Sequence, residues 1–307
     1  MYDLIILGGG PAGIAAGVYA SRKQLNTLFI TNEFGGQSIV SPDIQNWIGT
    51  PHISGADLAK SLENHLKTYA GEFVTIKTGA SVTTIAKNDT GFTVTLSDGT
   101  SHETKTVLIA TGSSRRKLSA VGADTYDQKG LTYCATCDGP MFSGMDVVVI
   151  GGGNAGFETA AQLLAYTKSV TLLNHGDTYK ADPVTVEKVL AHPHMTGILN
   201  AETTEIVGDT FVTGVTYTDK SDGQSHTIPA TGVFVEIGML PNTEYAKDVV
   251  ELDAYKRVKI DPWTQRTTTE GVWAAGDCTD VRYHQNNISA GDAVKALEDI
   301  YMYIKTQ

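Results

Sequence analysis

The chain repeats one pattern of hydrophobic and polar positions. An apolar stretch at residues 5–7 runs into three glycines, and the alanine-rich residues 11–20 that follow are typical of a helix packed against a strand. The same order returns later, where the apolar residues 149–150 run into three more glycines and then into the alanine-rich residues 154–163. The pattern therefore predicts two strand–turn–helix units of one plan.

The two halves of the chain also share later segments. Residues 107–112, Val-Leu-Ile-Ala-Thr-Gly, correspond to residues 233–238, Val-Phe-Val-Glu-Ile-Gly. Before each of them lies a polar stretch that alternates in hydrophobicity and turns at Asp-Gly, at residues 92–99 and 212–223. Apolar strands that alternate with helices are typical of α/β domains, and the polar stretches predict a small antiparallel insertion in each domain.

The end of the chain holds one predicted strand, residues 271–277, and one predicted helix, residues 288–305, with a helical stripe of apolar side chains. A single strand and a single helix cannot bury a core by themselves, so we expect them to return and complete the first domain. The predicted fold is therefore α/β, with two doubly wound, Rossmann-like dinucleotide-binding domains, the second inserted into the first.

The domain boundaries follow from the two crossings between these domains. We place one crossing near Arg116 and Lys117 and the other near residues 238–243, where Pro241 and Asn242 mark a break in the pattern. The expected segments are 1–116 and 244–307 for the outer domain and 117–243 for the inserted domain.

Composition narrows the class of protein. The 307 residues, 41% hydrophobic and 19% charged, are ordinary for a globular protein of two domains. A net charge of -11 argues against nucleic acid and against an anionic membrane surface as partners. No basic leader precedes the first apolar stretch, and no apolar run reaches membrane-spanning length. We therefore expect a cytoplasmic protein.

Both glycine-rich turns carry the pattern Gly-x-Gly-x-x-Gly between a predicted strand and a predicted helix, the context in which such turns bind dinucleotides. The first glycine makes the turn, the second lets the backbone approach a pyrophosphate, and the third lets helix and strand pack closely. A tight turn without a ligand is the alternative. The predicted contacts are Gly8, Gly10, Pro11, Ala12 and Gly13 in the first turn and Gly151, Gly153, Asn154, Ala155 and Gly156 in the second.

Three cysteines occur, and two of them, Cys134 and Cys137, form a Cys-x-x-Cys pair that Asp138 follows. In a reducing compartment such a pair is more often redox-active or metal-binding than structural. Zinc usually needs a second pair of Cys or His ligands at similar spacing, so we predict a redox pair and no metal site. Cys278 stands alone, and a small packed thiol is the favoured interpretation.

The order of these motifs closely resembles the low-molecular-weight thioredoxin reductases and the flavoprotein subunit of alkyl hydroperoxide reductase. The resemblance covers nearly the whole chain. It rests on both glycine turns, the Cys-x-x-Cys pair, and the segments Gly35-Gly36-Gln37, Asn46-Trp47, Ala110-Thr111-Gly112 and Gly276-Asp277. It implies FAD in the outer domain, a nicotinamide nucleotide, NADPH or NADH, in the inserted domain, and a homodimer.

The resemblance also implies roles for single residues at the FAD site. Asp277 would bond the ribityl chain, and Gln285 would lie at the start of a helix that faces the flavin pyrimidine ring. His284 stands where close relatives carry arginine or lysine, so it is either a weaker cation beside the cofactor or a boundary residue. The predicted contacts beyond the glycine turn are Gly36, Gln37, Asn46, Ala110, Thr111, Gly112, Gly276, Asp277, His284 and Gln285.

For the dithiol, the resemblance implies that Cys137 faces the flavin and that Cys134 attacks the disulfide of a thioredoxin- or glutaredoxin-like partner. Asp138 would protonate the leaving thiolate; without the resemblance, it would be interpreted as a surface residue. If Cys134 begins a helix, the helix dipole lowers the pKa of a thiol there. Electrons would then pass from the nicotinamide nucleotide through FAD and the dithiol to the partner.

The nucleotide preference is where the sequence departs from its relatives. Residues 174–180 read Asn-His-Gly-Asp-Thr-Tyr-Lys, without the arginine pair that binds a 2′-phosphate and without the glutamate that holds a bare ribose. We expect the nucleotide to contact Asn174, His175 and Lys180. Residues 208–242 resemble the hydroperoxide-reductase branch more closely, but the sequence does not include the N-terminal dithiol domain of that branch, so electrons would leave to a separate protein.

Three other functions stay open at this point. The first is an NADH-dependent reductase of a peroxiredoxin carrier. The second is a ferredoxin-linked thioredoxin reductase whose nucleotide site is degenerate, which the weak basicity of residues 174–180 would allow. The third is a flavoprotein whose dithiol senses redox state without turnover.

Overall fold

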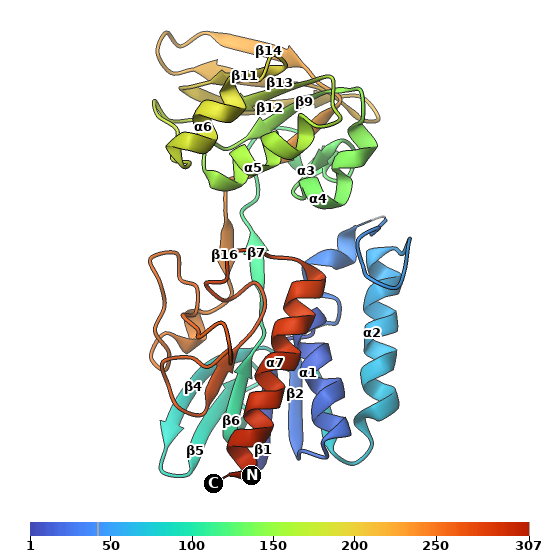
Figure 1. Cartoon of the computed structure of the whole chain (residues 1–307), viewed down its shortest axis with the longest axis vertical. Coiled ribbons are helices and arrows are strands. Elements are labelled where there is room, and N and C mark those ends of the chain that lie inside the picture. The colour runs from blue at the N-terminus through green and yellow to red at the C-terminus, as the bar shows by residue number, and fades with distance from the viewer. Residues whose placement is uncertain (42, 307) are drawn as a thin grey trace. The chain divides into compact units, whose positions relative to one another are not determined.

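The computed structural model describes residues 1–41 and 43–306, and the chain divides into two compact units. Unit 1 comprises Met1–Ser114 and Leu240–Gln307, and unit 2 comprises Arg115–Met239. The chain passes between the units through β7 (Ser113–Arg115) and β16 (Met239–Pro241), which pair in a two-stranded sheet (Figure 1). The predicted α/β fold, with the second domain inserted into the first, is confirmed.

Unit 1 is built on a seven-stranded sheet. Its strands are β1 (Tyr2–Leu7), β2 (Thr27–Thr31), β3 (Val74–Thr78), β4 (Val82–Asn88), β5 (Gly91–Leu96), β6 (Ser101–Ile109) and β17 (Val272–Ala274). They run in the order β3-β2-β1-β6-β5-β4, with β17 also paired to β6. β1 lies parallel to both β2 and β6, whereas β5 is antiparallel to β4 and β6. The strand order therefore reverses between β1 and β6, at whose carboxyl ends an α/β sheet binds its ligand.

Three helices cover one face of this sheet. They are α1 (Pro11–Arg22), α2 (Gly55–Ala70) and α7 (Asn286–Lys305), and short 3-10 turns occur at η1 (Gly36–Val40) and η3 (Glu244–Ala246). In Figure 1, α1 lies between α2 and α7. Fully buried side chains such as Ile6, Phe29 and Leu297 fill the layer between these helices and the sheet. On the other face, Leu7 and Val94 pack with side chains of residues 246–258.

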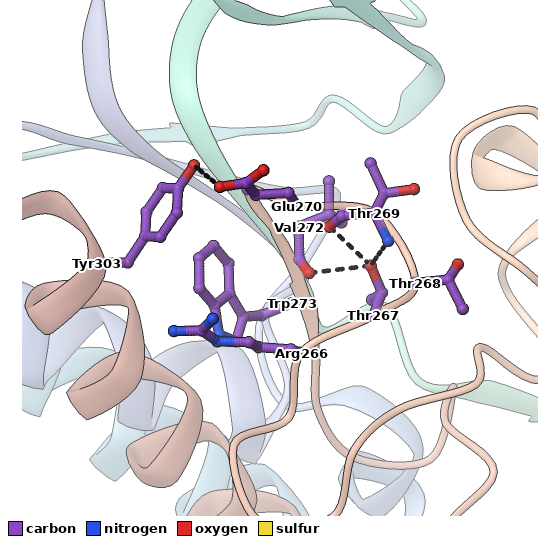
Figure 2. Close-up of a pocket in the computed structure, with 9 residues that line it drawn as sticks. Arg266, Thr267, Thr268, Thr269, Glu270, Val272, Trp273 and Tyr303 are labelled. Carbon is purple, nitrogen blue, oxygen red and sulfur yellow. Dashed lines mark hydrogen bonds between the residues drawn. The ribbon is translucent and has the colours of Figure 1, made fainter. Parts of the chain in front are cut away.

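A polar and aromatic network fastens α7 to the sheet. The Arg266 guanidinium bonds the Asp299 carboxylate at 2.5 Å, and the Trp273 indole nitrogen donates to the same carboxylate at 2.9 Å. The Trp273 and Tyr303 rings meet edge to face, 5.3 Å between centroids. Figure 2 shows Arg266, Trp273 and Tyr303 grouped together. The three residues line a pocket with a volume of about 280 Å³. The network joins Asp299 and Tyr303 of α7 to Trp273 of β17.

Unit 2 repeats the plan on a smaller scale. Its five-stranded parallel sheet contains β8 (Leu131–Thr132), β9 (Asp146–Ile150), β10 (Ser169–Leu173), β11 (Met195–Ile198) and β15 (Gly232–Val235), in the order β11-β10-β9-β15-β8. A three-stranded antiparallel sheet is formed by β12 (Ala201–Gly208), β13 (Val212–Asp219) and β14 (Ser225–Pro229). The helices are α3 (Ala123–Tyr126), α4 (Ala135–Asp138), α5 (Asn154–Leu163) and α6 (Pro183–Leu190), with a 3-10 turn η2 (Gly139–Phe142).

The unit 2 sheet is buried on both faces, which is why its strands are almost continuously apolar. Val149 and Phe234 pack against Phe157 of α5 on one face, and Val148 and Val215 meet on the face that the antiparallel sheet covers. The two antiparallel insertions predicted from alternating sequence are thus both present.

The predicted helix at residues 154–163 matches the bounds of α5. α7 begins two residues earlier than predicted, because extended backbone at Gln285 makes Asn286 the first helical residue. The predicted strand at 271–277 was too long: it is limited to Val272–Ala274, since Gly271 and Gly276 both have positive φ, +87° and +79°, and leave the extended conformation. Within residues 1–41 and 43–306, no helix has the length and apolar character needed to cross a bilayer.

Candidate functional site

The first glycine turn has the geometry that a pyrophosphate needs. Gly8 has φ +121°, and a Cβ there would overlap the Ala110 carbonyl oxygen, while a Cβ on Gly13 would overlap the Gly8 carbonyl oxygen. Gly10 is different, because the atom nearest to its added Cβ is the Gly36 Cα at 3.9 Å. The outer glycines therefore permit close packing, and the middle glycine leaves the backbone open to a ligand.

The second turn repeats this geometry residue by residue. Gly151 has φ +129°, and a Cβ there would overlap the Glu236 carbonyl oxygen. A Cβ on Gly156 would overlap the Gly151 carbonyl oxygen, whereas one on Gly153 would have no atom within 4 Å. Both turns therefore have the form of dinucleotide-binding turns, at corresponding places in the two units.

The helices that follow the turns leave their first backbone N–H groups uncapped by side chains. α1 and α5 are preceded by Gly10 and Gly153, and neither helix start has a side-chain capping bond. An uncapped helix N-terminus offers N–H donors and partial positive charge to a phosphate. Pro11 and Ala12 lie in the first turn of α1, and Asn154 and Ala155 in that of α5. These features fit the pyrophosphate groups of FAD in unit 1 and of a nicotinamide nucleotide in unit 2.

In unit 1, hydrogen bonds tie the start of α7 to Ser38, Asn46 and Ile48. The Asn46 side chain donates to the Gln285 side chain at 3.2 Å, and the Asn287 side chain donates to the Asn46 carbonyl at 2.7 Å. Ser38 donates to Asn286 at 2.9 Å. The structure thus brings the predicted Asn46 and Gln285 together. Asn287 and Ser38 were missed, although the run Gln285-Asn286-Asn287 of helix-starting residue types was a usable signal.

Other predicted residues of unit 1 lie around this helix start and the sheet edge. Asp277 accepts a hydrogen bond from Ser289 of α7 at 3.1 Å. Thr111 donates to the Asn242 carbonyl at 2.7 Å. His284 has a buried Nε2 with no hydrogen-bond partner among the described residues, an atom that a polar group of a bound cofactor could satisfy. The remaining predicted positions lie in or shortly after other elements of unit 1: Gly36 and Gln37 in η1, Ala110 and Gly112 after β6, and Gly276 after β17.

The redox pair lies in unit 2, where Cys134 and Cys137 form a disulfide with Cα atoms 5.3 Å apart. Cys134 immediately precedes the single-turn helix α4, and its Sγ accepts from the Cys137 backbone N–H at 3.2 Å. The Thr132 hydroxyl accepts from the Cys134 N–H at 3.2 Å and donates to the Asp138 carboxylate. Thr132 therefore links the dithiol to the acid. It was not predicted, and its place two residues before Cys134 gave no signal.

Asp138 is buried rather than on the surface. Burial raises the pKa of the Asp138 carboxyl, while the hydrogen bond from Thr132 and the charge of Arg115 partly oppose this rise. A raised pKa allows the carboxyl to carry a proton closer to neutral pH than an exposed aspartate can. The geometry therefore provides a proton-holding group connected to the backbone of Cys134 through one hydroxyl.

Cys278 is a buried thiol that contacts the Ile109 and Ala275 carbonyl oxygens. Burial raises the pKa of Cys278 to about 12, so the thiol stays protonated. Its interpretation as a small packed thiol is confirmed.

In unit 2, the loop after β10 carries the predicted nucleotide contacts. Asn174 is buried, and its side-chain amide donates to the Gly176 and Thr178 carbonyls at 3.0 and 2.9 Å. His175 and Lys180 are exposed, and the Lys180 backbone N–H donates to the Gly152 carbonyl at 2.8 Å. The loop therefore lies against the second glycine turn, with Asn174 fixing its shape and His175 and Lys180 available to a ligand.

One further ionisable group beside this turn was missed. Glu236 follows β15 directly and accepts a hydrogen bond from Thr159 of α5 at 2.8 Å. Burial is the main cause that raises the pKa of Glu236 to about 7. The internal repeat could have identified it, because the corresponding residue in the first half is Ala110.

Comparisons with known proteins agree with this geometry. A family model described as "Pyridine nucleotide-disulphide oxidoreductase" matches residues 2–293. A subunit of alkyl hydroperoxide reductase in Staphylococcus epidermidis is 39% identical over 303 residues, 99% of this chain and 59% of that protein. "NADH dehydrogenase" of Bacillus subtilis is 37% identical over 303 residues, 99% of this chain and 58% of that protein. The chain thus spans less than two thirds of the length of these curated relatives.

Among solved structures, thioredoxin reductase from Streptococcus pyogenes superposes with a TM-score of 0.91 at 32% identity, covering 100% of this chain and 99% of that one. The similarity therefore includes the whole fold, both glycine turns and the segment with the disulfide.

Proposed function

The chain belongs to the pyridine nucleotide-disulphide oxidoreductase family, and from this premise we propose that it passes electrons from a nicotinamide nucleotide, through FAD and the Cys134–Cys137 pair, to a thioredoxin- or glutaredoxin-like protein. The observation that carries the proposal is the link from Cys134 through Thr132 to the buried Asp138, in a unit that also has an open dinucleotide turn. When bound, FAD and the nicotinamide nucleotide would supply the electron pair that opens the disulfide.

The protein's own residues perform the exchange with the partner. The Cys134 thiolate attacks one sulfur of the partner disulfide, which forms a mixed disulfide and releases the other partner sulfur as a thiolate. Cys137 then attacks Cys134, so that the Cys134–Cys137 disulfide forms again and the second partner thiolate leaves. Asp138 supplies a proton to a leaving thiolate, and its raised pKa suits that role. Two electrons pass to the partner in each cycle.

Nucleotide choice rests on the loop after β10. This loop exposes the imidazole of His175 and the ammonium group of Lys180, and Asp177 adds a negative charge to it. This set offers a 2′-phosphate no arginine fork, so we infer that both NADH and NADPH serve, with a preference of no more than about tenfold to thirtyfold. A relative named "NADH dehydrogenase" supports this inference.

The test is anaerobic mixing of the yellow holoprotein with each nucleotide, followed by turnover with thioredoxin. We expect rapid bleaching of the flavin and reduction of thioredoxin by the wild type. A Cys137→Ser variant should hold a mixed disulfide with a partner that lacks its resolving cysteine, and Cys134→Ser should not. If neither nucleotide bleaches the flavin but reduced ferredoxin does, the ferredoxin-linked alternative replaces this proposal.

A second candidate acceptor is the disulfide carrier of a peroxiredoxin. The relative named as a subunit of alkyl hydroperoxide reductase, 39% identical over 303 residues, favours it. Parallel turnover with thioredoxin and with an isolated carrier domain of a hydroperoxide reductase decides between the two, because the true acceptor should have the higher kcat/KM.

A further inference from the structure

The internal repeat isolates one position at which the two nucleotide turns differ in charge. In unit 1 the residue after β6 is Ala110, whose carbonyl closes against Gly8. In unit 2 the residue after β15 is Glu236, whose carbonyl closes against Gly151 in the same way. Close packing at this position uses only the backbone. The carboxyl of Glu236 therefore has no part in closing the turn, and its presence calls for another explanation.

Glu236 lies at the point where the unit 2 sheet reverses its strand order. β9 and β15 are parallel neighbours, with Ile150 opposite Val235 at their carboxyl ends, and β10 lies on the other side of β9. In doubly wound sheets a dinucleotide lies across the crevice at this reversal. Gly151 and Glu236 are the residues that follow the two strands on either side of it.

The loop after β10 indicates which half of the nucleotide Glu236 would meet. A group on the loop after the second strand of such a unit contacts the ribose of the adenosine half, and here that loop contains Asn174 and Lys180. The adenosine half then lies on the β10 side of the glycine turn. The nicotinamide half lies on the opposite side, where β15 ends and Glu236 begins the next loop.

The surroundings of Glu236 keep its ionisation adjustable. Its carboxyl accepts a hydrogen bond from Thr159 of α5. It also interacts electrostatically with the positive charge of Arg115 on β7 and with the negative charge of Glu158 on α5. The first two favour the ionised form, while burial and Glu158 favour the neutral form. Burial is the largest of these influences and raises the pKa of the carboxyl to about 7, so a ligand charge nearby can shift its protonation.

We propose that Glu236 is a specificity-determining residue of the nucleotide site, whose ionised form favours the oxidised nicotinamide and whose neutral form favours the reduced one. The proposal rests on the proposed function, since it requires a nicotinamide nucleotide in unit 2. The physical reason is the charge of the ring, which is positive when oxidised and zero when reduced. A carboxylate next to a cation is stabilised, whereas beside a neutral ring that displaces water it is destabilised.

The test measures binding rather than turnover. The dissociation constant of NAD⁺ is measured for the oxidised holoprotein, and that of NADH for holoprotein fully reduced by dithionite, which has no capacity to accept hydride. NADP⁺ and NADPH replace NAD⁺ and NADH in these measurements if NADPH reduces the flavin faster than NADH does. Between about pH 6 and about pH 8, the ratio Kd(NAD⁺)/Kd(NADH) should fall by about fivefold or more in the wild type. The reason is that a difference of about one unit between the pKa values of Glu236 in the two complexes changes this ratio about tenfold over the complete titration.

Two variants and one control make this test specific. Glu236→Gln keeps the shape of the side chain but cannot ionise. The fall in Kd(NAD⁺)/Kd(NADH) with rising pH that arises from Glu236 should therefore disappear. Thr159→Val keeps the carboxyl but removes a donor to its ionised form, so the midpoint of the fall should move to higher pH. Glu205→Gln, an exposed carboxyl on β12 of the same unit, should behave as the wild type.

The outcomes separate this inference from the proposed function. If both nucleotides bind and bleach the flavin, but the pH dependence of the ratio is the same in wild type and Glu236→Gln, the inference is overturned and the proposed function stands. Should Glu236→Gln not fold, an unmoved midpoint in Thr159→Val overturns it instead. If no nicotinamide nucleotide binds the wild type, the inference and the nucleotide-dependent activity both fall.

Discussion

The Asn46 side chain donates a hydrogen bond to the Gln285 side chain at 3.2 Å, although the two residues lie 239 positions apart in the sequence. Gln285 directly precedes α7, and its side chain makes no capping hydrogen bond to the first N–H groups of that helix. The Gln285 side chain is therefore engaged with Asn46. The helix N-terminus therefore keeps its partial positive charge for another acceptor, as the proposed flavin site requires.

The first prediction concerns this junction. Asn287→Ala removes the hydrogen bonds from Asn287 to the Asn46 carbonyl and from the Ile48 N–H to Asn287. At about 1 kcal/mol for each bond, the affinity for FAD should fall roughly tenfold to thirtyfold. Flavin fluorescence on dilution measures the loss. Asn64→Ala on the exposed side of α2 is the matched control, and equal loss in both variants would contradict the role of the junction.

The second prediction separates ligand contact from packing in the first glycine turn. Gly10→Val should fold normally but lose FAD, because the nearest atom to a Cβ at Gly10 is 3.9 Å away and only a ligand needs that space. Gly13→Ala should instead lower thermal stability, since its Cβ would overlap the Gly8 carbonyl oxygen. Thermal unfolding of the apoproteins and FAD content after purification measure the two effects. Full FAD occupancy in Gly10→Val would show that this turn does not bind the cofactor.

The third prediction concerns the proton that the leaving thiolate needs. Asp138→Asn removes the buried acid and should slow thioredoxin reduction by about a hundredfold or more, as loss of a general acid does. Bleaching of the flavin by the nucleotide should change much less. In the wild type, turnover should decline as pH rises through the raised pKa of Asp138, and this decline should be absent in Asp138→Asn. A similar slowing of flavin bleaching would indicate a general structural defect instead.

Local sequence patterns predicted the elements but few of their long-range contacts. The bounds of α5 and both glycine turns could be predicted, because apolar periodicity and Gly-x-Gly-x-x-Gly are local patterns. The pairing of Asn46 with Gln285 could not, because it joins two loops that only the completed fold brings together.

Burial was the other property that single residues did not reveal. Asp138 would be a surface residue by its type alone, yet the fold buries it against Thr132. Glu236 lies at a strand end where its repeat partner is Ala110. Its pKa depends first on its burial and then on how far Thr159, Arg115 and Glu158 lie from it. Distances of this kind come from packing, not from spacing in the chain.

The fourth prediction is a pH dependence of stability that arises from Glu236. Folding raises its pKa from 4.5 to about 7, so the unfolded chain releases this proton at a lower pH than the native protein does. The contribution of Glu236 to stability is therefore largest below about pH 4.5 and is lost as pH rises toward about 7. Glu236→Gln lacks this loss. We compare the free energy of unfolding of the variant with that of the wild type at two pH values. The difference, variant minus wild type, should be larger at about pH 8 than at about pH 4 by roughly 1–3 kcal/mol.

Thermal and urea unfolding of the two proteins at both pH values measure this difference. Glu205→Gln provides the control, because its exposed carboxyl should leave the pH dependence of the wild type unchanged. If the free energies of unfolding of Glu236→Gln and wild type differed by the same amount at both pH values, this would contradict the raised pKa of Glu236.

The last prediction concerns nucleotide choice, and the structure decides which residues to change. Asn174 is buried and holds the loop through two donated hydrogen bonds, so it should be kept. His175 is exposed, and a Cβ on Gly176 would meet its nearest atom at 3.5 Å, so both positions accept arginine. With only Lys180 as a fixed cation, the wild type should distinguish NADH from NADPH by no more than about tenfold to thirtyfold.

His175→Arg combined with Gly176→Arg should shift the preference toward NADPH by at least about tenfold, because a guanidinium pair can bind the 2′-phosphate bidentately. The rate of flavin bleaching as a function of each nucleotide concentration is the measurement. Asn174→Glu removes the two amide donors that shape the loop and should weaken both nucleotides together. If the double arginine variant keeps the wild-type preference while both nucleotides still bleach the flavin, the loop after β10 does not contact the adenosine ribose.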